Sequence, residues 1–309
     1  MTPSRPRRHP AHVLLAALVA ALAALVWPAG AVGSTDTVAW YHAHDVIAAV
    51  NAAPPEVPLV ILLGGSVAKE CTVSDTDWAA QVRRRGGPEV VARNISSPFR
   101  TFYEDVALVK GLPQVPTIVF IGVNLGRFTQ PYQSAEISLT PDPARSAGYT
   151  QHGMGSQILS LEKKRALVLR WLRNIYPYFK SRHAYDLGQL ELLVSACKRR
   201  GLHPVIVEMP RNLSVIGRAF DVPVRQYHRG CYAIARKYGI PFVTFLRAAA
   251  LVNRDFRDLG HLVDSGRTKY QRLLSDKTIA LLKAYGMTPP IYETSSAARM
   301  PDYRPRRST

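Results

Sequence analysis

The protein has 309 residues, of which 47% are hydrophobic and 20% are charged. A chain of this size buries one sizeable core with at most a small cap, which excludes two large domains. The formal net charge of +18 favours an anionic partner, but the arginines show none of the regular aromatic interleaving that is typical of nucleic-acid readout.

The first 33 residues have the order of a secretory signal. Three arginines precede an uncharged apolar run at 13–27, and small residues follow it. The same run is long enough for an uncleaved membrane anchor, which is the alternative. Either form places the rest of the chain outside the cytoplasm. We therefore predict a protein that is secreted or anchored to the outer face of the cytoplasmic membrane. Its surface partners would be anionic envelope polymers or a membrane surface, with no nucleic acid.

Short apolar runs alternate with helical stretches in residues 34–288, which we predict to be one domain. The runs have the pattern of strands buried on both faces, and they lie at 57–63, 90–95, 117–123, 204–208 and 241–245. Helices are predicted at 38–53, 78–85, 102–110, 159–176, 185–200, 225–238 and 265–285. This alternation predicts a three-layer α/β/α sandwich, flavodoxin-like, with a five-stranded, mainly parallel sheet.

Two segments depart from the alternation. Residues 126–157 are rich in Pro, Ser, Thr, Gly and Gln and are too long for an ordinary connection. This insertion either shapes a substrate cleft as a lid or is a surface excursion. The basic tail at 289–309 has the composition of a disordered segment.

The three cysteines are too few for a disulfide-held scaffold. Cys197 and Cys231 lie on two predicted helices and can form a bridge in an oxidising compartment. The prediction we favour is burial of all three thiols as small apolar side chains, with the bridge as the alternative. Cys71 has no histidine or metal-ligand spacing near it and is not a candidate nucleophile.

Polar residues follow two predicted strands at their carboxyl ends, where open α/β sheets bind ligands. Gly64-Gly65-Ser66 comes directly after the first strand, and its glycines allow a tight turn that leaves the serine unobstructed. Asn124 follows the third strand, where its amide can donate to an oxyanion. A plain turn at Ser66 and a capping role for Asn124 are the structural alternatives.

A third set, Asp258-Leu259-Gly260-His261, lies between the last strand and the last helix. A carboxylate three residues before a histidine can accept from Nδ1–H and leave Nε2 free to take a proton from a serine. An exposed aspartate beside a structural histidine is the alternative, but the position at the same sheet edge favours the catalytic interpretation.

In order and spacing, these sets resemble the motif blocks of the SGNH, or GDSL-like, hydrolases. The resemblance covers residues 57–285 and rests on Gly64-Gly65-Ser66-Val67, Gly122-Val123-Asn124 and Asp258-Leu259-Gly260-His261. It implies an SGNH-type fold, with Ser66 as the nucleophile, His261 as the base and Asp258 as its orienting carboxylate. It also implies that Asn124 and the Ser66 amide form the oxyanion hole.

The chain departs from the family pattern in two places. Gly65 stands where the family has the aspartate that gives it its name, which lies outside the triad. The second-strand block, 94–98, contains no glycine, although the family uses a glycine amide there as an oxyanion donor. Ser96 or Ser97 can supply a backbone N–H instead, and Ser97 is our candidate.

Arg127 and Arg211 are candidates for binding an anionic group of the substrate, with solvated loop arginines as the alternative. His183, His203 and His228 have no companions at ligand spacing, so we predict no metal and no cofactor.

These residues predict an extracytoplasmic serine esterase. It would cleave acyl esters of a small molecule, glycan, wall polymer or lipid through an acyl-enzyme on Ser66. An O-acyltransferase acting on envelope polysaccharide uses the same residues and is one alternative. A glycan-binding protein that keeps the fold and has weak catalysis is another.

Overall fold

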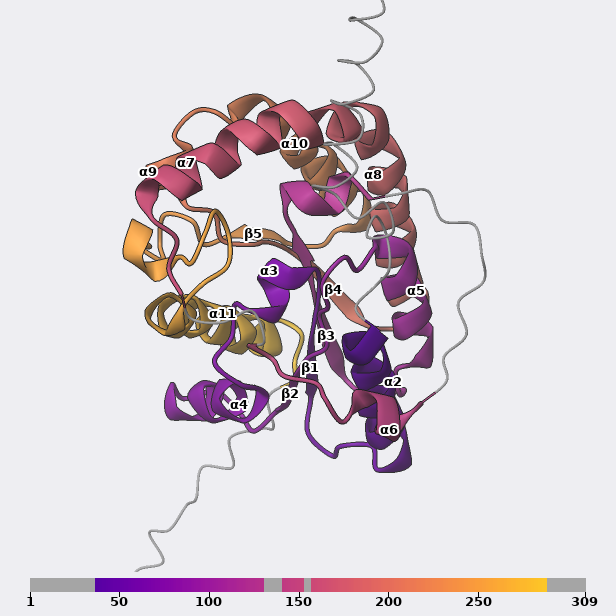
Figure 1. The fold of residues 1–309 in the computed structure, drawn as a ribbon. Coiled ribbons are helices and arrows are strands. Elements are labelled where there is room, and N and C mark those ends of the chain that lie inside the picture. Colours follow the sequence, from indigo (N-terminus) through magenta and orange to yellow (C-terminus); the bar gives the residue numbers. More distant parts are fainter. Residues whose placement is uncertain (1–36, 131–140, 153–156, 288–309) are drawn as a thin grey trace, which may run out of the picture.

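The computed structural model describes residues 37–130, 141–152 and 157–287, in which helices cover both faces of a five-stranded sheet (Figure 1). The strands are β1 (Leu59–Leu63), β2 (Val91–Asn94), β3 (Thr117–Val123), β4 (His203–Glu208) and β5 (Phe242–Thr244). They lie in the order β2-β1-β3-β4-β5, and every pairing is parallel. The predicted α/β/α sandwich is therefore confirmed.

The helices and helical turns are α2 (Thr37–Ala52), α3 (Ser66–Lys69), α4 (Asp75–Arg84), α5 (Phe102–Gly111), η1 (Leu125–Phe128), α6 (Pro143–Ser146), α7 (Leu161–Arg170), η2 (Trp171–Ile175), α8 (Tyr176–Arg199), α9 (Leu213–Ile216), α10 (Asp221–Tyr238), η3 (Asn253–Asp255) and α11 (Asp264–Ala284). Within the described ranges, none of these is both long and apolar enough to cross a membrane. The predicted signal segment at 1–33 and the tail at 289–309 lie outside the described residues.

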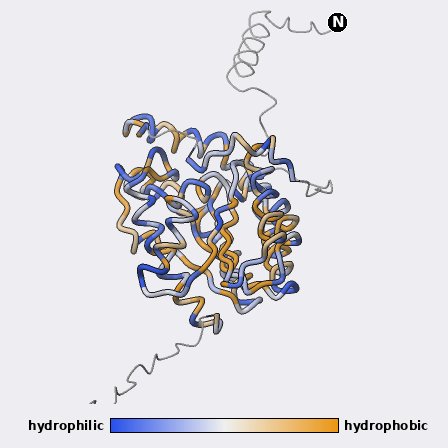
Figure 2. Tube along the Cα trace, turned by 90° about the horizontal axis from the view of Figure 1, so that it is seen from below, coloured by the Kyte–Doolittle hydropathy of each residue, from blue (hydrophilic) through white to orange (hydrophobic). Residues whose placement is uncertain are grey.

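Alternate side chains of β1 pack into two separate apolar cores, as the two-residue period of a strand requires. Leu59 and Ile61 pack with α2, α5, α8 and α10, whereas Val60 and Leu62 pack with α4 and α11. All five residues of β1 are buried. Figure 2 shows the apolar strands inside a more hydrophilic outer layer. This burial on both faces explains why the strand is continuously apolar in sequence.

The predicted helices at 159–176 and 185–200 are parts of one continuous helical path, so the predicted break between them is wrong. α7 passes through the π-helical turn η2 into α8. Pro177 lies in the first turn of α8, where a missing N–H is tolerated, and the π turn adapts the preceding backbone. The four-residue helices α3, α6 and α9 were not predicted because they are too short to show a helical period.

Within the predicted insertion at 126–157, the described residues 141–152 lie beside α2 and the turn after α3. Arg145 donates to the Tyr41 hydroxyl at 2.6 Å, and the Tyr149 ring stacks on His42 with the centroids 3.7 Å apart. Gln151 Nε2 donates to Thr72 Oγ1 at 2.6 Å. Residues 141–152 are thus fixed next to α2 and the turn that follows the helix beginning with Ser66. The role of the insertion as a lid stays a prediction, and residues 131–140 and 153–156 lie outside the described residues.

All three cysteines are buried and free. The alternative of a Cys197–Cys231 bridge is therefore wrong, and burial as small apolar side chains is confirmed. Burial raises the pKa of the Cys197 thiol to about 12, so this thiol is protonated at neutral pH and is a poor nucleophile.

Candidate active site

The nucleophile candidate begins a short helix directly after the central strand β1. Ser66 is the first residue of α3, and Gly64 and Gly65 form the turn that leads into it. A Cβ at Gly64 would lie 2.4 Å from the Cβ of Ala68, so only glycine fits at this turn. Gly122 is also tightly placed, because its Cβ would lie 3.2 Å from the same Ala68 atom. The two glycines let α3 sit close against the ends of β1 and β3.

Ser66, His261 and Asp258 form a hydrogen-bonded chain. His261 Nε2 lies 2.9 Å from Ser66 Oγ, and His261 Nδ1 lies 2.8 Å from Asp258 Oδ2. In this arrangement Nδ1–H donates to the carboxylate, and Nε2 accepts from the serine hydroxyl. The side chains of His261 and Asp258 are 17% and 14% exposed, so the chain is sheltered while Ser66 is only half-buried. The geometry is that of a Ser-His-Asp triad.

The carboxylate of Asp258 is held by several donors besides His261 Nδ1. Its Oδ1 accepts from the backbone N–H of Gly260 and of His261, each at 2.9 Å. Arg257 Nη2 donates to Oδ2 at 3.0 Å. Burial alone raises the pKa of Asp258, but the hydrogen bonds and charge of His261 outweigh it, so the pKa lies well below its usual range. Asp258 is therefore a carboxylate at neutral pH, with a fixed orientation toward the imidazole.

The loop that carries the triad acid is tied down by two side chains from outside it. Asn212 Nδ2 donates to the Asp258 carbonyl at 3.2 Å. The buried Lys164 ammonium of α7 donates to the carbonyls of Asn253 and Phe256, at 3.0 and 2.7 Å. Burial lowers the pKa of Lys164, and the charge of Asp258 opposes this shift. No motif at Lys164 predicted this contact, because its partners lie about 90 residues further along the chain.

Asn124 lies at the end of β3 in the place predicted for an oxyanion donor. Its Oδ1 accepts from the backbone N–H of Arg127 at 3.1 Å and so caps η1. Among the described residues, its Nδ2 has no hydrogen-bond acceptor, and neither does the backbone N–H of Ser66. The capping alternative and the donor interpretation are thus compatible, because they use different atoms of one amide.

The prediction that the Ser97 amide completes the oxyanion hole is wrong. The Ser97 N–H donates to the Gly64 carbonyl at 3.0 Å, and the Ser96 N–H donates to Asn94 Oδ1 at 3.2 Å. Both amides serve to attach the loop after β2 to its own strand and to β1, so neither is available to a substrate.

Phe99 has the one backbone N–H between 95 and 101 that has no acceptor among the described residues. The amides at 95, 96, 97, 100 and 101 are all used, and Pro98 has no N–H. Phe99 is also held at φ 57°, a left-handed conformation that is strained for a bulky side chain. Its ring is 57% exposed. Sequence reasoning missed Phe99 because nothing in the residue type indicates a positive φ.

Arg127 is not a substrate-binding residue, contrary to the prediction. Its residue surface is 1% exposed, and its guanidinium donates to Asp105 Oδ2 at 2.5 Å and to the Gly122 carbonyl at 3.0 Å. It also lies over the Phe102 ring, 3.9 Å from the centroid. The guanidinium is paired with the buried Asp105 carboxylate, so Arg127 stabilises the end of β3 and is not exposed to a substrate.

Arg211 is engaged by a buried carboxylate as well. Its Nη2 lies 2.9 Å from Glu208 Oε1, and its side chain is 14% exposed. The same oxygen accepts from Tyr227 Oη at 2.5 Å and from His228 Nε2 at 2.8 Å. Burial raises the pKa of Glu208, but the hydrogen bond of His228 and the positive charge of Arg211 outweigh burial and lower the pKa to about 2. A role of Arg211 toward the substrate stays a prediction.

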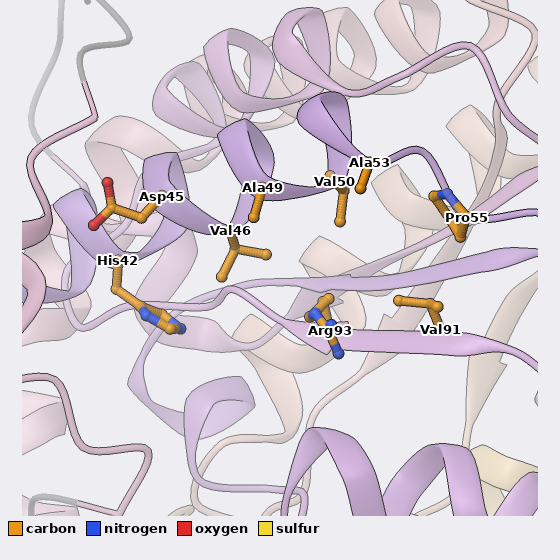
Figure 3. A pocket seen from close by; sticks show the side chains of 9 residues that line it. All are labelled: His42, Asp45, Val46, Ala49, Val50, Ala53, Pro55, Val91 and Arg93. Atoms are coloured by element: carbon orange, nitrogen blue, oxygen red, sulfur yellow. The ribbon is translucent and has the colours of Figure 1, made fainter.

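A pocket of about 490 Å³ lies between α2 and the edge strand β2, and Figure 3 shows the side chains that line it. Its walls are mainly apolar, and its polar lining residues are His42, Asp45 and Arg93. No triad residue lines this pocket, so it is separate from the site described above. The described residues contain no cluster of three or more His, Cys, Asp or Glu side chains that could hold a metal ion.

No protein-family model matches the chain, and no curated protein matches it. Several solved structures are similar in fold, including the following three. A lipolytic protein of the G-D-S-L family from Veillonella parvula DSM 2008 is 11% identical, with a TM-score of 0.43 over 72% of this chain and 99% of the other. The acetyl xylan esterase AlAXEase is 13% identical, with a TM-score of 0.42 over 72% and 99%. A carbohydrate esterase of family 3 from Talaromyces cellulolyticus is 13% identical, with a TM-score of 0.41 over 74% and 99%.

Identities and TM-scores this low assign no activity to the chain. The fold class follows from the strand order, and the chemistry follows from the contacts of Ser66, His261 and Asp258. Fold alone does not determine function.

Replacement of Asn124 by alanine is expected to lower kcat for ester hydrolysis by about 10²- to 10³-fold, because one oxyanion donor is lost. Asn124→Asp separates the two roles of the side chain. The aspartate keeps an oxygen to cap the Arg127 N–H but has no amide donor, so the loss of kcat should be at least as large as in Asn124→Ala. Steady-state kinetics on a p-nitrophenyl ester would measure both. Near-normal kcat in Asn124→Asp would show that only the cap matters.

Proposed function

We propose that the protein is an SGNH-type serine esterase that forms an acyl-enzyme on Ser66. The observation that carries the proposal is the hydrogen bond of 2.9 Å between His261 Nε2 and Ser66 Oγ, with Asp258 on the other ring nitrogen. A serine hydroxyl needs a neighbouring base to act as a nucleophile at neutral pH, and this arrangement supplies the base in the required tautomer.

In the first step, Ser66 Oγ bonds to the ester carbonyl carbon while its proton passes to His261 Nε2. The carbonyl oxygen becomes an oxyanion, which Asn124 Nδ2 and the backbone N–H groups of Ser66 and Phe99 stabilise. The C–O bond to the alcohol then breaks, and His261 returns the proton to the departing oxygen. Water, deprotonated by His261, repeats the sequence on the acyl-enzyme, releasing the acid and restoring Ser66.

The proposed setting is extracytoplasmic, with an acylated glycan, a wall polymer or a lipid as substrate. The support for this setting is the order of residues 1–33, in which basic, apolar and small residues follow one another as in an export signal. The high positive charge supports a substrate carried on an anionic surface.

A fluorophosphonate probe tests the proposal directly, because it reacts only with an activated serine. The full chain is expected to gain one probe adduct by intact mass, and peptide mapping should place the adduct on Ser66. Ser195→Ala is a suitable control, since this serine lies on α8 outside the triad and its hydroxyl accepts from Arg199 Nη1 at 2.6 Å; it should label like the wild type.

Absence of labelling in a folded wild-type sample would contradict the proposal and favour a binding protein with an inactive triad. If labelling occurs but ester turnover requires a sugar acceptor in place of water, the enzyme is an acyltransferase and hydrolysis is wrong as the reaction.

A further inference from the structure

The path from α7 through η2 into α8 carries an unusual combination of exposed side chains. Residues 158–182, which we name the basic ridge, contain seven lysines and arginines and one acidic residue, Glu162. Five of these basic residues are exposed, Lys163, Arg165, Arg170, Arg173 and Lys180. The ridge therefore presents a strongly positive surface.

The same segment exposes large apolar side chains. Leu169 is 63% exposed, and Ile158, Leu161 and Tyr178 are 46%, 43% and 50% exposed. Leu161, Arg165 and Leu169 follow one another at intervals of four residues, so they share one face of α7. Single exposed apolar residues are ordinary, but helices that lie on a membrane surface combine exposed leucines with lysines and arginines, as this segment does.

The ridge is attached to the loop that carries the triad acid. The Leu159 N–H donates to the Arg257 carbonyl at 2.9 Å. Lys164 donates three hydrogen bonds to Asn253 and Phe256 in the same loop. In Figure 1, α7 runs along the rim of the molecule above this loop and α3. Any surface that the ridge contacts is thus held at a fixed position relative to Ser66.

We propose that the basic ridge docks on an anionic lipid surface and holds the triad beside esters carried by that membrane; the choice of substrate class rests on the proposed function. Phosphate headgroups would pair with the lysines and arginines, and each such residue near the surface strengthens membrane binding by about fivefold. Leu161 and Leu169 would enter the boundary between headgroups and acyl chains. A soluble polyanion would satisfy the charges but leave these leucines in water, which is why the membrane is favoured.

The test measures insertion of the ridge itself, so that a membrane anchor elsewhere in the full chain does not obscure it. Leu169→Cys is labelled with an environment-sensitive dye and mixed with vesicles of phosphatidylcholine and phosphatidylglycerol that contain brominated lipid. The native thiols are buried, so labelling is selective. Leu192→Cys is the matched control, because Leu192 is 52% exposed on α8 outside the ridge.

The dye at position 169 is expected to be quenched several-fold more than the dye at position 192, and the difference should vanish with phosphatidylcholine alone. In the Leu169→Cys background, Arg165→Gln with Arg173→Gln should raise the vesicle concentration for half-maximal quenching by about 10- to 30-fold. Arg83→Gln with Arg84→Gln removes the same charge from exposed positions on α4 and should have little effect.

Equal quenching at positions 169 and 192 would overturn the proposal. So would binding of soluble polyphosphate that depends on Arg165 and Arg173, if vesicles leave the dye at 169 unquenched. Fluorophosphonate labelling of the same samples keeps the two proposals apart: labelling without quenching refutes only the docking surface, and quenching without labelling refutes only the esterase.

Discussion

Replacing Ser66 or His261 by alanine is expected to lower kcat for ester hydrolysis by about 10⁵- to 10⁶-fold, and the double variant is expected to lose no more than either single variant. In the proposed mechanism the two side chains act as one unit, because the proton passes across the 2.9 Å contact between Oγ and Nε2. Without the hydroxyl there is no nucleophile, and without the imidazole the hydroxyl is not deprotonated.

Steady-state kinetics on a p-nitrophenyl ester would give the three values. Ser181→Ala and His203→Ala are matched controls on α8 and at the start of β4, and both should keep wild-type kcat. Circular dichroism would confirm that each variant is folded. Losses that multiply in the double variant would show that Ser66 and His261 contribute separately, which is incompatible with a shared proton transfer.

The sheet could be predicted from the sequence because its strands are buried on both faces. Continuous apolar runs such as TIVFIGV at 117–123 have no other stable place in a chain of this size. The triad was predicted from the order and spacing of the motif sets and from their resemblance to the SGNH hydrolases, and this resemblance implied that Ser66 and the Asp258–His261 turn lie at one edge of the parallel sheet. The order and spacing of these sets along the chain were sufficient for this prediction.

The free backbone N–H of Phe99 and the burial of Arg127 could not be predicted in the same way. Which backbone N–H remains free depends on every other hydrogen bond in the loop after β2, and the strained φ of Phe99 is not encoded by its residue type. Arg127 was predicted to bind an anionic substrate group or to lie in solvent, because arginine side chains are mostly exposed. Its burial depends on Asp105, a partner 22 residues away, and such pairs leave no local pattern.

The cluster around Asp105 joins the two loops that flank the nucleophile. Arg127 contacts one carboxylate oxygen at 2.5 Å and Arg100 lies 3.8 Å from the other, with all three side chains at most 2% exposed. Arg100 also donates to the Ile95 carbonyl at 3.2 Å, and Arg127 donates to Gly122. Burial raises the pKa of the Asp105 carboxyl, and the two guanidinium groups oppose that shift. The loops after β2 and β3 are therefore held by one buried carboxylate.

Asp105→Ala is expected to lower the free energy of unfolding by about 3–5 kcal/mol at neutral pH, because two buried guanidinium groups lose their counterion. Urea denaturation followed by circular dichroism would measure it. Asp221→Ala is the matched control: Asp221 also lies near two arginines, Arg218 and Arg225, at 3.5 and 3.9 Å, but its side chain is 41% exposed. That variant should lose about 1 kcal/mol or less.

If both variants lost the same amount, Asp105 would contribute no more than a surface ion pair, and the loops would be held by packing alone. A larger loss at Asp105, accompanied by weaker fluorophosphonate labelling in samples that are still folded, would mean that the cluster also positions the oxyanion hole.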